Sequence, residues 1–321
     1  MVETLKGMVS DLNRYVFLNE SFSLTPNMIY SIIHDNDIID RLIEGNGPAL
    51  DKFFNGHRKK MKNFILSVQM LNEDNIDLNI RKMNSGGISP ITFFDNDYPY
   101  RLRNIDDPPL VLFHIGTLFD LSKCVAVSGT RSSEKRINRI TYELASVLVE
   151  NDYTVASGLA KGVDSYAHEG ALSNEKGSSV AVMANGLDRV IPKCNVDLAK
   201  RIALRGAVLS EKALRPEPSK YDFIRRNRII SGISGVQIIM ESSGSGGTEH
   251  QFRIALKQGK PVVVYSGPGL PEKGKRSVKS MISRGAKEFS TIEEALDLIK
   301  AEWPKEGSTA RRENFSLDRW S

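Results

Sequence analysis

The sequence is poor in the residues that build metal sites. It has two cysteines, Cys124 and Cys194, and five histidines, and none of them is grouped with another at the short spacing that zinc ligands require. We therefore predict no metal site.

Long apolar runs and nucleotide motifs are also missing. No segment approaches the about 20 apolar residues of a membrane helix, and the first residues lack the apolar region of a signal peptide. A reduced, cytoplasmic protein with no membrane partner is expected. There is no Gly-x-Gly-x-x-Gly fingerprint and no Walker A motif. Dinucleotide and P-loop sites are thus excluded at the level of motifs, and no cofactor is predicted.

What the chain does have is length, apolar residues and positive charge. Its 321 residues predict two domains, and a hydrophobic content of 40% is enough for a buried core. The net charge of +5 and the pI of about 9.0 favour an anionic partner, most commonly nucleic acid.

The first part of the chain is predicted to be helical. Apolar residues recur at helical spacing from Met28 to Ile43 and from Leu50 to Leu71, and Thr25-Pro26 is typical of a helix start. Glycine and serine between Ser85 and Pro90 indicate a linker. The predicted divisions are 1–85, a helical domain; 86–120, a linker and the strand leading into the next domain; 121–302, a Rossmann-like domain; and 303–321, a flexible tail.

Short apolar runs then alternate with helical runs. The apolar runs begin near Val125, Tyr153, Ser179, Ala207, Val236 and Pro261. Apolar strands alternating with helices predict an α/β fold with a doubly wound, mainly parallel Rossmann-like sheet, covered on both faces.

Ligands of such sheets bind beyond the carboxyl ends of the strands. Four predicted strand ends are followed by glycine-containing loops, whose backbone N–H groups suit phosphate. One such loop is equally compatible with simple turn geometry, but four at one sheet edge favour a phosphate-binding groove. The candidate residues are Ser128, Gly129, Thr130 and Arg131; Ser157, Gly158 and Lys161; Gly186 and Lys193; and Gly244, Ser245, Gly246, Gly247 and Thr248.

The densest basic stretch runs from Arg205 to Arg228, and its end adds four candidates, Arg225, Arg226, Asn227 and Arg228. Three arginines within four helical residues cannot share one face, so a structural role is open for some of them. Tyr221 and Phe223 are candidates for stacking on bases or for core positions.

Six segments form a set of motifs in a fixed order: Phe93 to Gly116, Ser128 to Arg131, Ser157 to Leu172, Gly186 to Pro192, Leu209 to Glu211 and Arg226 to Gly232. Together they resemble the motifs of the DprA/Smf family of DNA-processing proteins, and the resemblance covers about residues 93–290.

The resemblance implies a protein without catalytic residues. It implies binding of single-stranded DNA, delivery of that DNA to a RecA-type recombinase in transformation or recombination, and a homodimer. It also places Arg131 and Lys193 at or near positions that contact DNA phosphates.

One loop departs from the family pattern. Gly246-Gly247-Thr248-Glu249 resembles instead a loop of lysine-decarboxylase-like phosphoribohydrolases, in which a glutamate lies beside the ribose. A nucleotide-binding or nucleoside-monophosphate-hydrolysing enzyme is therefore the alternative hypothesis. For Glu249 three roles are open: a helix-end carboxylate, a partner of an arginine such as Arg226, or a general base.

Overall fold

A computed structural model describes residues 37–69, 73–118, 120–175, 177–214 and 217–304, together with Met28, Ser31, Ile32 and Asp35. Thr25-Pro26, Leu71 and the predicted tail beyond residue 304 lie outside the described residues.

One sheet of nine strands runs through the described chain, in the order β1-β2-β6-β5-β4-β3-β7-β8-β9. The seven strands from β6 to β9 in this order are parallel, whereas β2 is antiparallel to both β6 and β1. The strands are β1 Ser89–Thr92, β2 Val111–Gly116, β3 Cys124–Ser128, β4 Thr154–Ser157, β5 Ser179–Met183, β6 Ala207–Ser210, β7 Val236–Ile239, β8 Val262–Tyr265 and β9 Lys287–Phe289.

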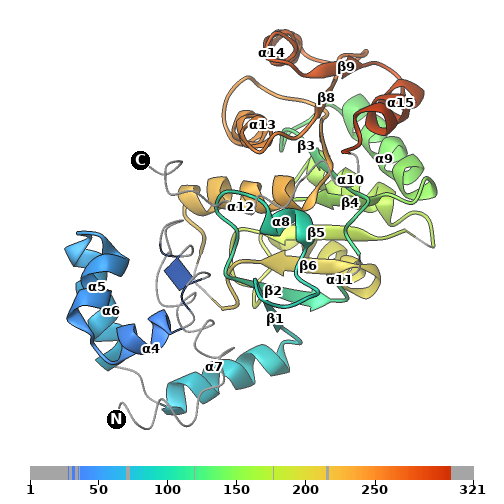
Figure 1. Ribbon diagram of the computed structural model, residues 1–321. Helices are drawn as coiled ribbons and strands as arrows, with labels where there is room; N and C mark the ends of the chain where they lie inside the picture. The colour runs from blue at the N-terminus through green and yellow to red at the C-terminus, as the bar shows by residue number, and fades with distance from the viewer. Residues whose placement is uncertain are drawn as a thin grey trace.

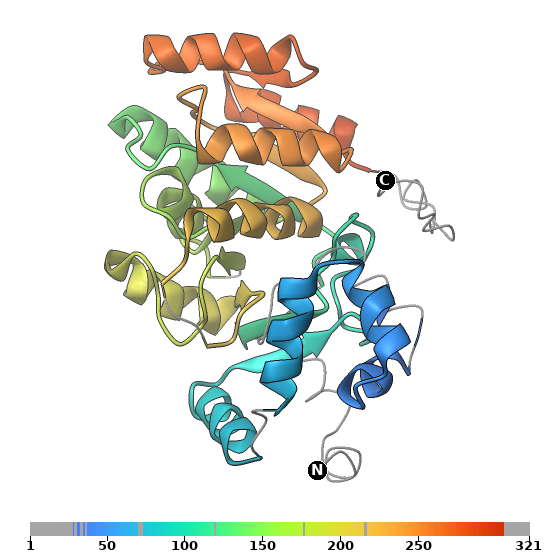
Figure 2. The same ribbon diagram turned by 90° about the vertical axis from the view of Figure 1, so that its left-hand side faces the viewer.

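Helices cover both faces of the sheet (Figures 1 and 2). One face carries α12, α13 and α14, and the other carries α9, α10, α11 and α15. The helices are α4 Ile38–Ile43, α5 Gly47–Phe54, α6 Arg58–Gln69, α7 Glu73–Ser85, α8 Tyr100–Arg103, α9 Lys135–Glu150, α10 Val163–Ala171, α11 Val196–Arg205, α12 Lys220–Ile233, α13 Gly247–Lys257, α14 Glu272–Ile282 and α15 Ile292–Glu302, with a 3-10 turn at Lys193–Asn195.

The Rossmann-like, mainly parallel α/β fold expected from the sequence is confirmed. The central strands β3, β5 and β7 are buried along their whole length, because helices cover both of their faces. The helices α4–α7 precede the sheet, and the aromatic rings of Phe53, Phe54 and Phe64 pack together in their core.

The predicted linker holds a strand that the sequence reading missed. Ser89–Thr92 forms β1 at the sheet edge and pairs with β2, so residues 86–120 contribute two strands to the sheet. Pro90 concealed this strand, because proline is a strand breaker except at edges, where one side of the backbone needs no partner. The domain boundary at residue 120 stays a prediction, since the sheet continues across it.

The order of the strands fixes where a ligand can enter. From β3 the chain moves outward through β4, β5 and β6, and α12 then returns it to β7, on the other side of β3. Loops that leave β3 and β7 at their carboxyl ends therefore diverge and open a crevice between them.

Within the described residues, no helix is both long and apolar enough to cross a membrane. No cluster of three or more His, Cys, Asp or Glu side chains suited to a metal ion occurs there either.

The fold buries one histidine in a way that affects its stability. His168 of α10 is fully buried, and its Nδ1 lies 2.7 Å from the Ser179 hydroxyl, which itself donates to the Val155 carbonyl. Nδ1 is therefore the donor, and Nε2 has no partner among the described residues. Burial, with a smaller effect from Arg226, lowers the pKa of His168 to about 3.

We expect acid to weaken the fold through this group. The unfolded chain takes up a proton near the ordinary histidine pKa of 6.5, whereas the folded chain does not. The contribution of His168 to the unfolding free energy is therefore fully present above pH 6.5 and is lost as the pH drops toward 3. Between pH 7.5 and 5, roughly, the parent should lose about 1–2 kcal/mol of unfolding free energy that His168→Gln does not lose.

Urea unfolding of both proteins at several pH values measures this difference. His57→Gln, at an exposed position of the N-terminal region, should keep the slope of the parent. Equal slopes for the parent and His168→Gln would contradict the assignment.

Candidate functional site

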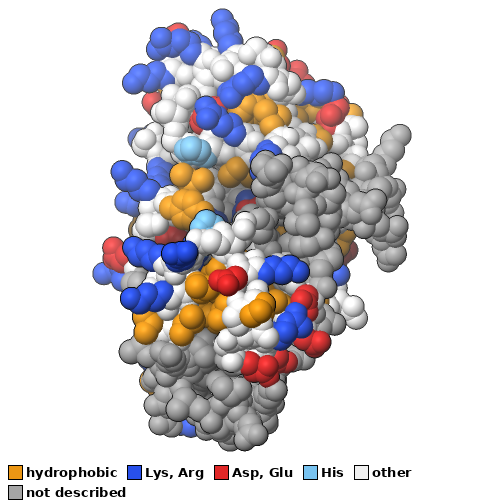
Figure 3. Space-filling model, turned by 60° about the vertical axis from the view of Figure 1, so that its left-hand side comes forward, with side chains coloured by type: hydrophobic (Ala, Val, Ile, Leu, Met, Phe, Trp, Pro, Cys, Tyr) orange, Lys and Arg blue, Asp and Glu red, His pale blue; other side chains and the backbone are white. Residues whose placement is uncertain are grey.

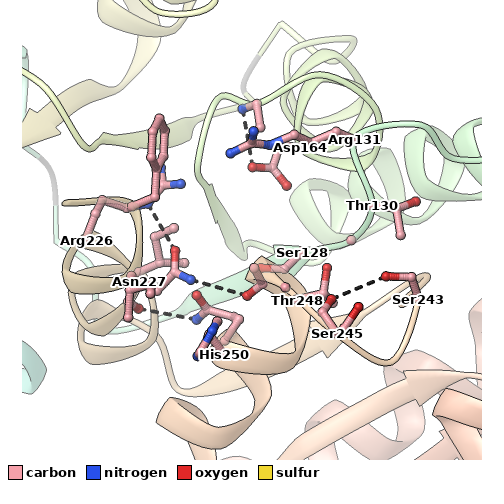
Figure 4. A pocket seen from close by; sticks show the side chains of 18 of the residues that line it. Ser128, Thr130, Arg131, Asp164, Arg226, Asn227, Ser243, Ser245, Thr248 and His250 are labelled. Atoms are coloured by element: carbon pink, nitrogen blue, oxygen red, sulfur yellow. Dashed lines mark hydrogen bonds between the residues drawn. The ribbon is translucent and has the colours of Figure 1, made fainter. Parts of the chain in front are cut away.

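A groove of about 650 Å³ opens at the carboxyl ends of β3 and β7. Its walls come from the loop after β3, the first turns of α12, and the loop that leads from β7 into α13 (Figure 4). We call this cavity the groove. The residues that line the groove include Ser128 to Ser132, Asp164, Lys220, Phe223, Ile224, Arg226, Asn227, Ser243, Ser245 to Thr248, His250 and Gln251.

The first wall joins a cation to an aromatic ring. Arg131 is exposed at the loop after β3, and its guanidinium carbon lies 5.2 Å from the centre of the Phe223 ring. This distance is within the range of cation–π contacts. Lys220, at the start of α12, is exposed and lines the same cavity. The wall thus offers two accessible positive charges and an aromatic face.

The opposite wall is bare backbone. Gly246 has a φ of +75°, which favours glycine, and neither Gly246 nor Gly247 has any atom within 4 Å of where a Cβ would stand. The protein's own packing therefore leaves this space open. Because α13 begins at Gly247, the unpaired N–H groups of its first turn lie at this wall and suit an anion.

Buried amides form the floor. The Gln237 side chain donates to the Ser128 hydroxyl at 3.2 Å, and Gln251 donates to the Gln237 side-chain oxygen at 2.8 Å. Gln251 also donates to the Asn227 carbonyl at 3.3 Å, and Asn227 donates to the Gly247 carbonyl at 3.4 Å. This chain of hydrogen bonds links β3, β7, α12 and α13, and so fixes the positions of both walls.

Arg226 closes the inner end of the groove. Its Nη1 donates to the Gly158 carbonyl at 2.7 Å and also to the Val182 carbonyl. Burial lowers its pKa to about 10, while Asp164 acts in the opposite direction. Arg226 therefore stays charged at neutral pH. Burial raises the pKa of the Asp164 carboxyl, against the effect of Arg226.

The other two arginines of α12 lie on a different face of the helix. Arg225 and Arg228 are three residues apart, so they share a face, and both pair with Glu211, at 3.0 and 2.7 Å. Arg228 also lies 2.9 Å from a carboxylate oxygen of Asp107. Both are therefore held in an ion-pair cluster outside the groove, and contact of Arg225 and Arg228 with phosphate stays a prediction.

The second predicted loop is largely structural as well. Ser157 is fully buried and donates to the Val127 carbonyl at 2.7 Å. At Gly158 a Cβ would stand 2.5 Å from Arg226 Nη1, so glycine is needed there to admit the guanidinium and not a ligand. These contacts give Ser157 and Gly158 structural roles, and phosphate binding by them stays a prediction. Lys161 and Lys193 are exposed but do not line the groove, Gly186 is buried outside it, and these three stay predictions.

The structure does bring together the other candidates. Ser128 to Arg131, Arg226, Asn227 and Ser245 to Thr248 all line the groove, while Gly244 lines a neighbouring cavity. Sequence reasoning missed Asp164, Ile224, His250 and Gln251, which also line it. One signal was available: Gln237 interrupts an otherwise apolar strand, and a buried amide there needs a partner such as Gln251.

Glu249 faces away from the groove. Its carboxylate accepts from Arg284 at 2.7 and 3.2 Å and from Arg253 at 3.0 Å. The Arg284 contact is the main reason that the pKa of Glu249 lies below its ordinary value. Two of the three roles considered agree with the structure: Glu249 lies in the first turn of α13 and it pairs with arginines, although the partners are Arg253 and Arg284 and not Arg226.

With this geometry in view, the chain can be compared with known proteins. Residues 89–300 match the family model described as DNA recombination-mediator protein A. The chain belongs to this family. The resemblance to DprA/Smf proteins is thereby confirmed.

Named relatives agree with this family. DNA processing protein DprA of Bacillus subtilis is 33% identical over 216 residues, which cover 66% of this chain and 71% of the relative. The DprA of Streptococcus pneumoniae is 35% identical over 210 residues, covering 64% and 72%. Protein Smf of Synechocystis sp. is 36% identical over 183 residues, covering 56% of this chain but only 45% of the relative.

Two solved structures are also similar. The X-ray structure of DprA from Streptococcus pneumoniae has a TM-score of 0.77 at 27% identity and covers 92% of this chain and 99% of that one. A DprA structure from Helicobacter pylori has a TM-score of 0.59 at 27% identity, covering 67% and 97%. That protein is described as binding single-stranded DNA.

The ion-pair cluster at Glu211 generates a prediction about stability. Although burial alone would raise the pKa of Glu211, Arg228 and Arg225 hold it below its ordinary value. Glu211→Gln removes the charge between two arginines, one of them 6% exposed. Removal of one partner from a buried ion pair is strongly destabilising, so we expect the unfolding free energy to fall by about 3 kcal/mol.

Denaturant unfolding measures this effect. Glu217→Gln is the matched control, because Glu217 is 74% exposed and pairs with Arg189 at the surface; its loss should be below about 0.5 kcal/mol. If the two variants are equally stable, the two arginines are not held by Glu211 as described.

Proposed function

We propose that this protein binds single-stranded DNA in the groove and acts as a DNA recombination mediator, not as an enzyme. The observation that carries the proposal is the wall formed by Arg131 and Phe223 opposite the bare backbone of Gly246 and Gly247. Membership of the DNA recombination-mediator protein A family supports the same conclusion.

The groove has the chemistry that a flexible nucleic acid strand requires. Arg131 and Lys220 supply exposed charges for phosphates, and α13 presents its first N–H groups to the same cavity. The Phe223 ring and the partly exposed Ile224 offer apolar surface on which bases can stack. A stiff duplex cannot bend its backbone into a cavity lined on three sides, so single strands should bind more tightly.

A nucleotide hydrolase is less well supported by the geometry. Its expected carboxylate, Glu249, is paired with Arg253 and Arg284 outside the groove. Among the described residues, Asp164 is the one acid that lines the groove; it is buried and accepts from the Ala160 N–H at 3.3 Å. An assay for release of free base from nucleoside monophosphates tests this alternative directly, and release that depends on Glu249 would overturn the proposed function.

Three finer points rest on family membership alone. We propose that the protein is cytoplasmic, that it forms homodimers, and that it delivers bound DNA to a RecA-type recombinase. Light scattering at micromolar concentration tests the dimer. Recombinase filament formation on DNA coated with single-strand-binding protein, with and without this protein, tests delivery.

Arg131 generates the first prediction about binding. Arg131→Ala removes one charged phosphate contact and should weaken binding of single-stranded DNA by about 1.5–3 kcal/mol, with no loss of stability because the side chain is exposed. Arg139→Ala, on α9 and 81% exposed, removes the same charge away from the groove and should bind like the parent. Fluorescence anisotropy with single-stranded and duplex oligonucleotides of equal length measures both effects. Unchanged affinity in Arg131→Ala, or equal affinity for single and double strands in the parent, would count against the groove as the binding site.

Gly247 generates a second prediction, based on shape and not on charge. Its φ is outside the left-handed region and no atom lies within 4 Å of an added Cβ, so Gly247→Ala should leave the fold intact and raise stability slightly, by about 0.5 kcal/mol. The new methyl group stands at the wall of the groove and should weaken DNA binding about tenfold. Gly47→Ala is the matched control, since Gly47 also begins a helix with open space around it. The prediction fails if both variants bind DNA as the parent does.

A further inference from the structure

A second cavity lies across the Ser243–Thr248 loop from the groove. Its volume is about 560 Å³, and it is bounded by this loop, α13, α14 and the turn after α14. Ser243 lines both cavities, so the loop is a wall that they share. We call the second cavity the basic pocket and define it by Ser243, Arg253, Lys273, Arg276, Ser277 and Arg284.

Positive charge dominates the basic pocket. Of the described residues, four cationic side chains line it together with a single carboxylate, that of Glu249. Arg284 and Arg253 both pair with that carboxylate. Lys273 and Arg276 are exposed and make no ion pair among the described residues. Figure 3 shows Lys and Arg side chains gathered at the upper end of this face, at the height of α14 in Figure 1.

The arginines of the pocket are held in place before any ligand arrives. Arg284 makes a bidentate contact with Glu249, donates from Nε to the Ser280 carbonyl at 3.0 Å, and stacks on Phe252 with its guanidinium carbon 4.4 Å from the ring centre. Arg253 contacts Glu249 through Nε, which leaves both of its Nη groups outside that contact. Glu249 therefore orients two arginines instead of opposing an anion.

One buried hydroxyl in the pocket lacks a partner. Ser277 lines the cavity and is 5% exposed, and its Oγ makes no hydrogen bond with any described residue. Buried hydroxyls in native proteins nearly always have a hydrogen-bond partner, so the Ser277 hydroxyl is available to donate to a ligand. Together with the unpaired cations, it indicates a ligand with anionic oxygens.

The shared loop offers no obstacle between the two cavities. Gly246 and Gly247 are exposed and carry no side chain. Gly244, with a φ of +79°, lies beside Ser277: a Cβ added at Gly244 would stand 3.8 Å from the Ser277 Cβ. A strand that leaves the groove over this loop meets the basic pocket next.

We propose that the basic pocket is a second phosphate subsite, which holds a backbone phosphate of the same DNA strand that occupies the groove. Lys273 and Arg276 bind the phosphate, Arg253 and Arg284 hold its far side, and the Ser277 hydroxyl donates to it. The inference rests on the proposed function and adds the path of the strand: from the Arg131 wall, over the glycine loop, toward α14.

The experiment compares short and long strands on the full chain. Oligo(dT) of about 6 nucleotides is short enough to be held by the groove, whereas about 20 nucleotides exceed it. The double variant Lys273→Ala/Arg276→Ala should bind the long strand about tenfold more weakly and the short strand like the parent. Its salt dependence with the long strand should fall by about 0.7 in the slope of log K against log salt, for one lost phosphate contact on a single strand.

Two further variants separate the pocket from general charge. Lys275→Ala/Lys279→Ala removes the same charge from exposed positions of α14 that do not line the pocket, and it should bind both strands nearly as the parent does. Ser277→Ala should be as stable as the parent, because the Ser277 hydroxyl has no hydrogen-bond partner among the described residues. It should bind the long strand about threefold more weakly than the parent does.

The outcomes are distinct. If the parent binds neither strand, the proposed function itself fails. If the parent binds both and the Lys273/Arg276 variant binds the long strand like the parent, or no worse than the Lys275/Lys279 variant, only the second subsite is refuted. A small-anion site is the third outcome: inorganic phosphate or a mononucleotide would bind the parent and not the Lys273/Arg276 variant, with long-strand affinity unchanged, and this too would refute the shared strand.

Discussion

Arg226 donates hydrogen bonds to backbone carbonyls at the ends of two parallel strands, through Gly158 after β4 and Val182 in β5. These bonds fix α12 across the carboxyl edge of the sheet, and the groove exists because α12 is held there. Gly158 is glycine for the same reason, since a Cβ would stand 2.5 Å from the guanidinium. Gly158 therefore makes room for an arginine that in turn supports the wall of the groove carrying Lys220 and Phe223.

Helical geometry then decides what each arginine of α12 does. At 100° per residue, Arg225 and Arg228 project together toward Glu211, while Arg226 projects toward the strand ends. The first two charges are neutralised by acids and contribute to stability. The exposed cations Arg131 and Lys220 stay at the surface of the groove, so binding an anion there requires no buried charge to be uncovered.

The sequence predicted the fold well because it is encoded locally. Apolar strands such as β5 and β7, alternating with amphipathic helices, leave few alternatives to a doubly wound sheet, and the glycine loops mark the edge at which the groove opens. What could not be predicted depends on contacts between distant residues. Nothing in the local sequence around Arg228 reveals its ion pairs with Glu211 and Asp107, and Lys161 and Lys193 lie at the same sheet edge without lining the groove. Pro90 is a local signal against a strand, because proline has no backbone N–H to donate. The strand β1 forms there because it pairs with β2 at the edge of the sheet.

The unusual Gly246-Gly247-Thr248-Glu249 sequence illustrates the same limit and shows what the loop does instead. Read alone, it resembles a catalytic loop, because glycine and a carboxylate stand next to each other. On a helix, however, consecutive residues face different sides: Thr248 and Gln251 turn toward the groove, whereas Glu249 and Arg253, four residues apart, turn toward the basic pocket. The carboxylate therefore does not repel an anion in the groove. It aligns Arg253 and Arg284 on the other side of the wall, so one short segment at the start of α13 can serve two anion-binding surfaces, with backbone N–H groups on one side and oriented guanidinium groups on the other.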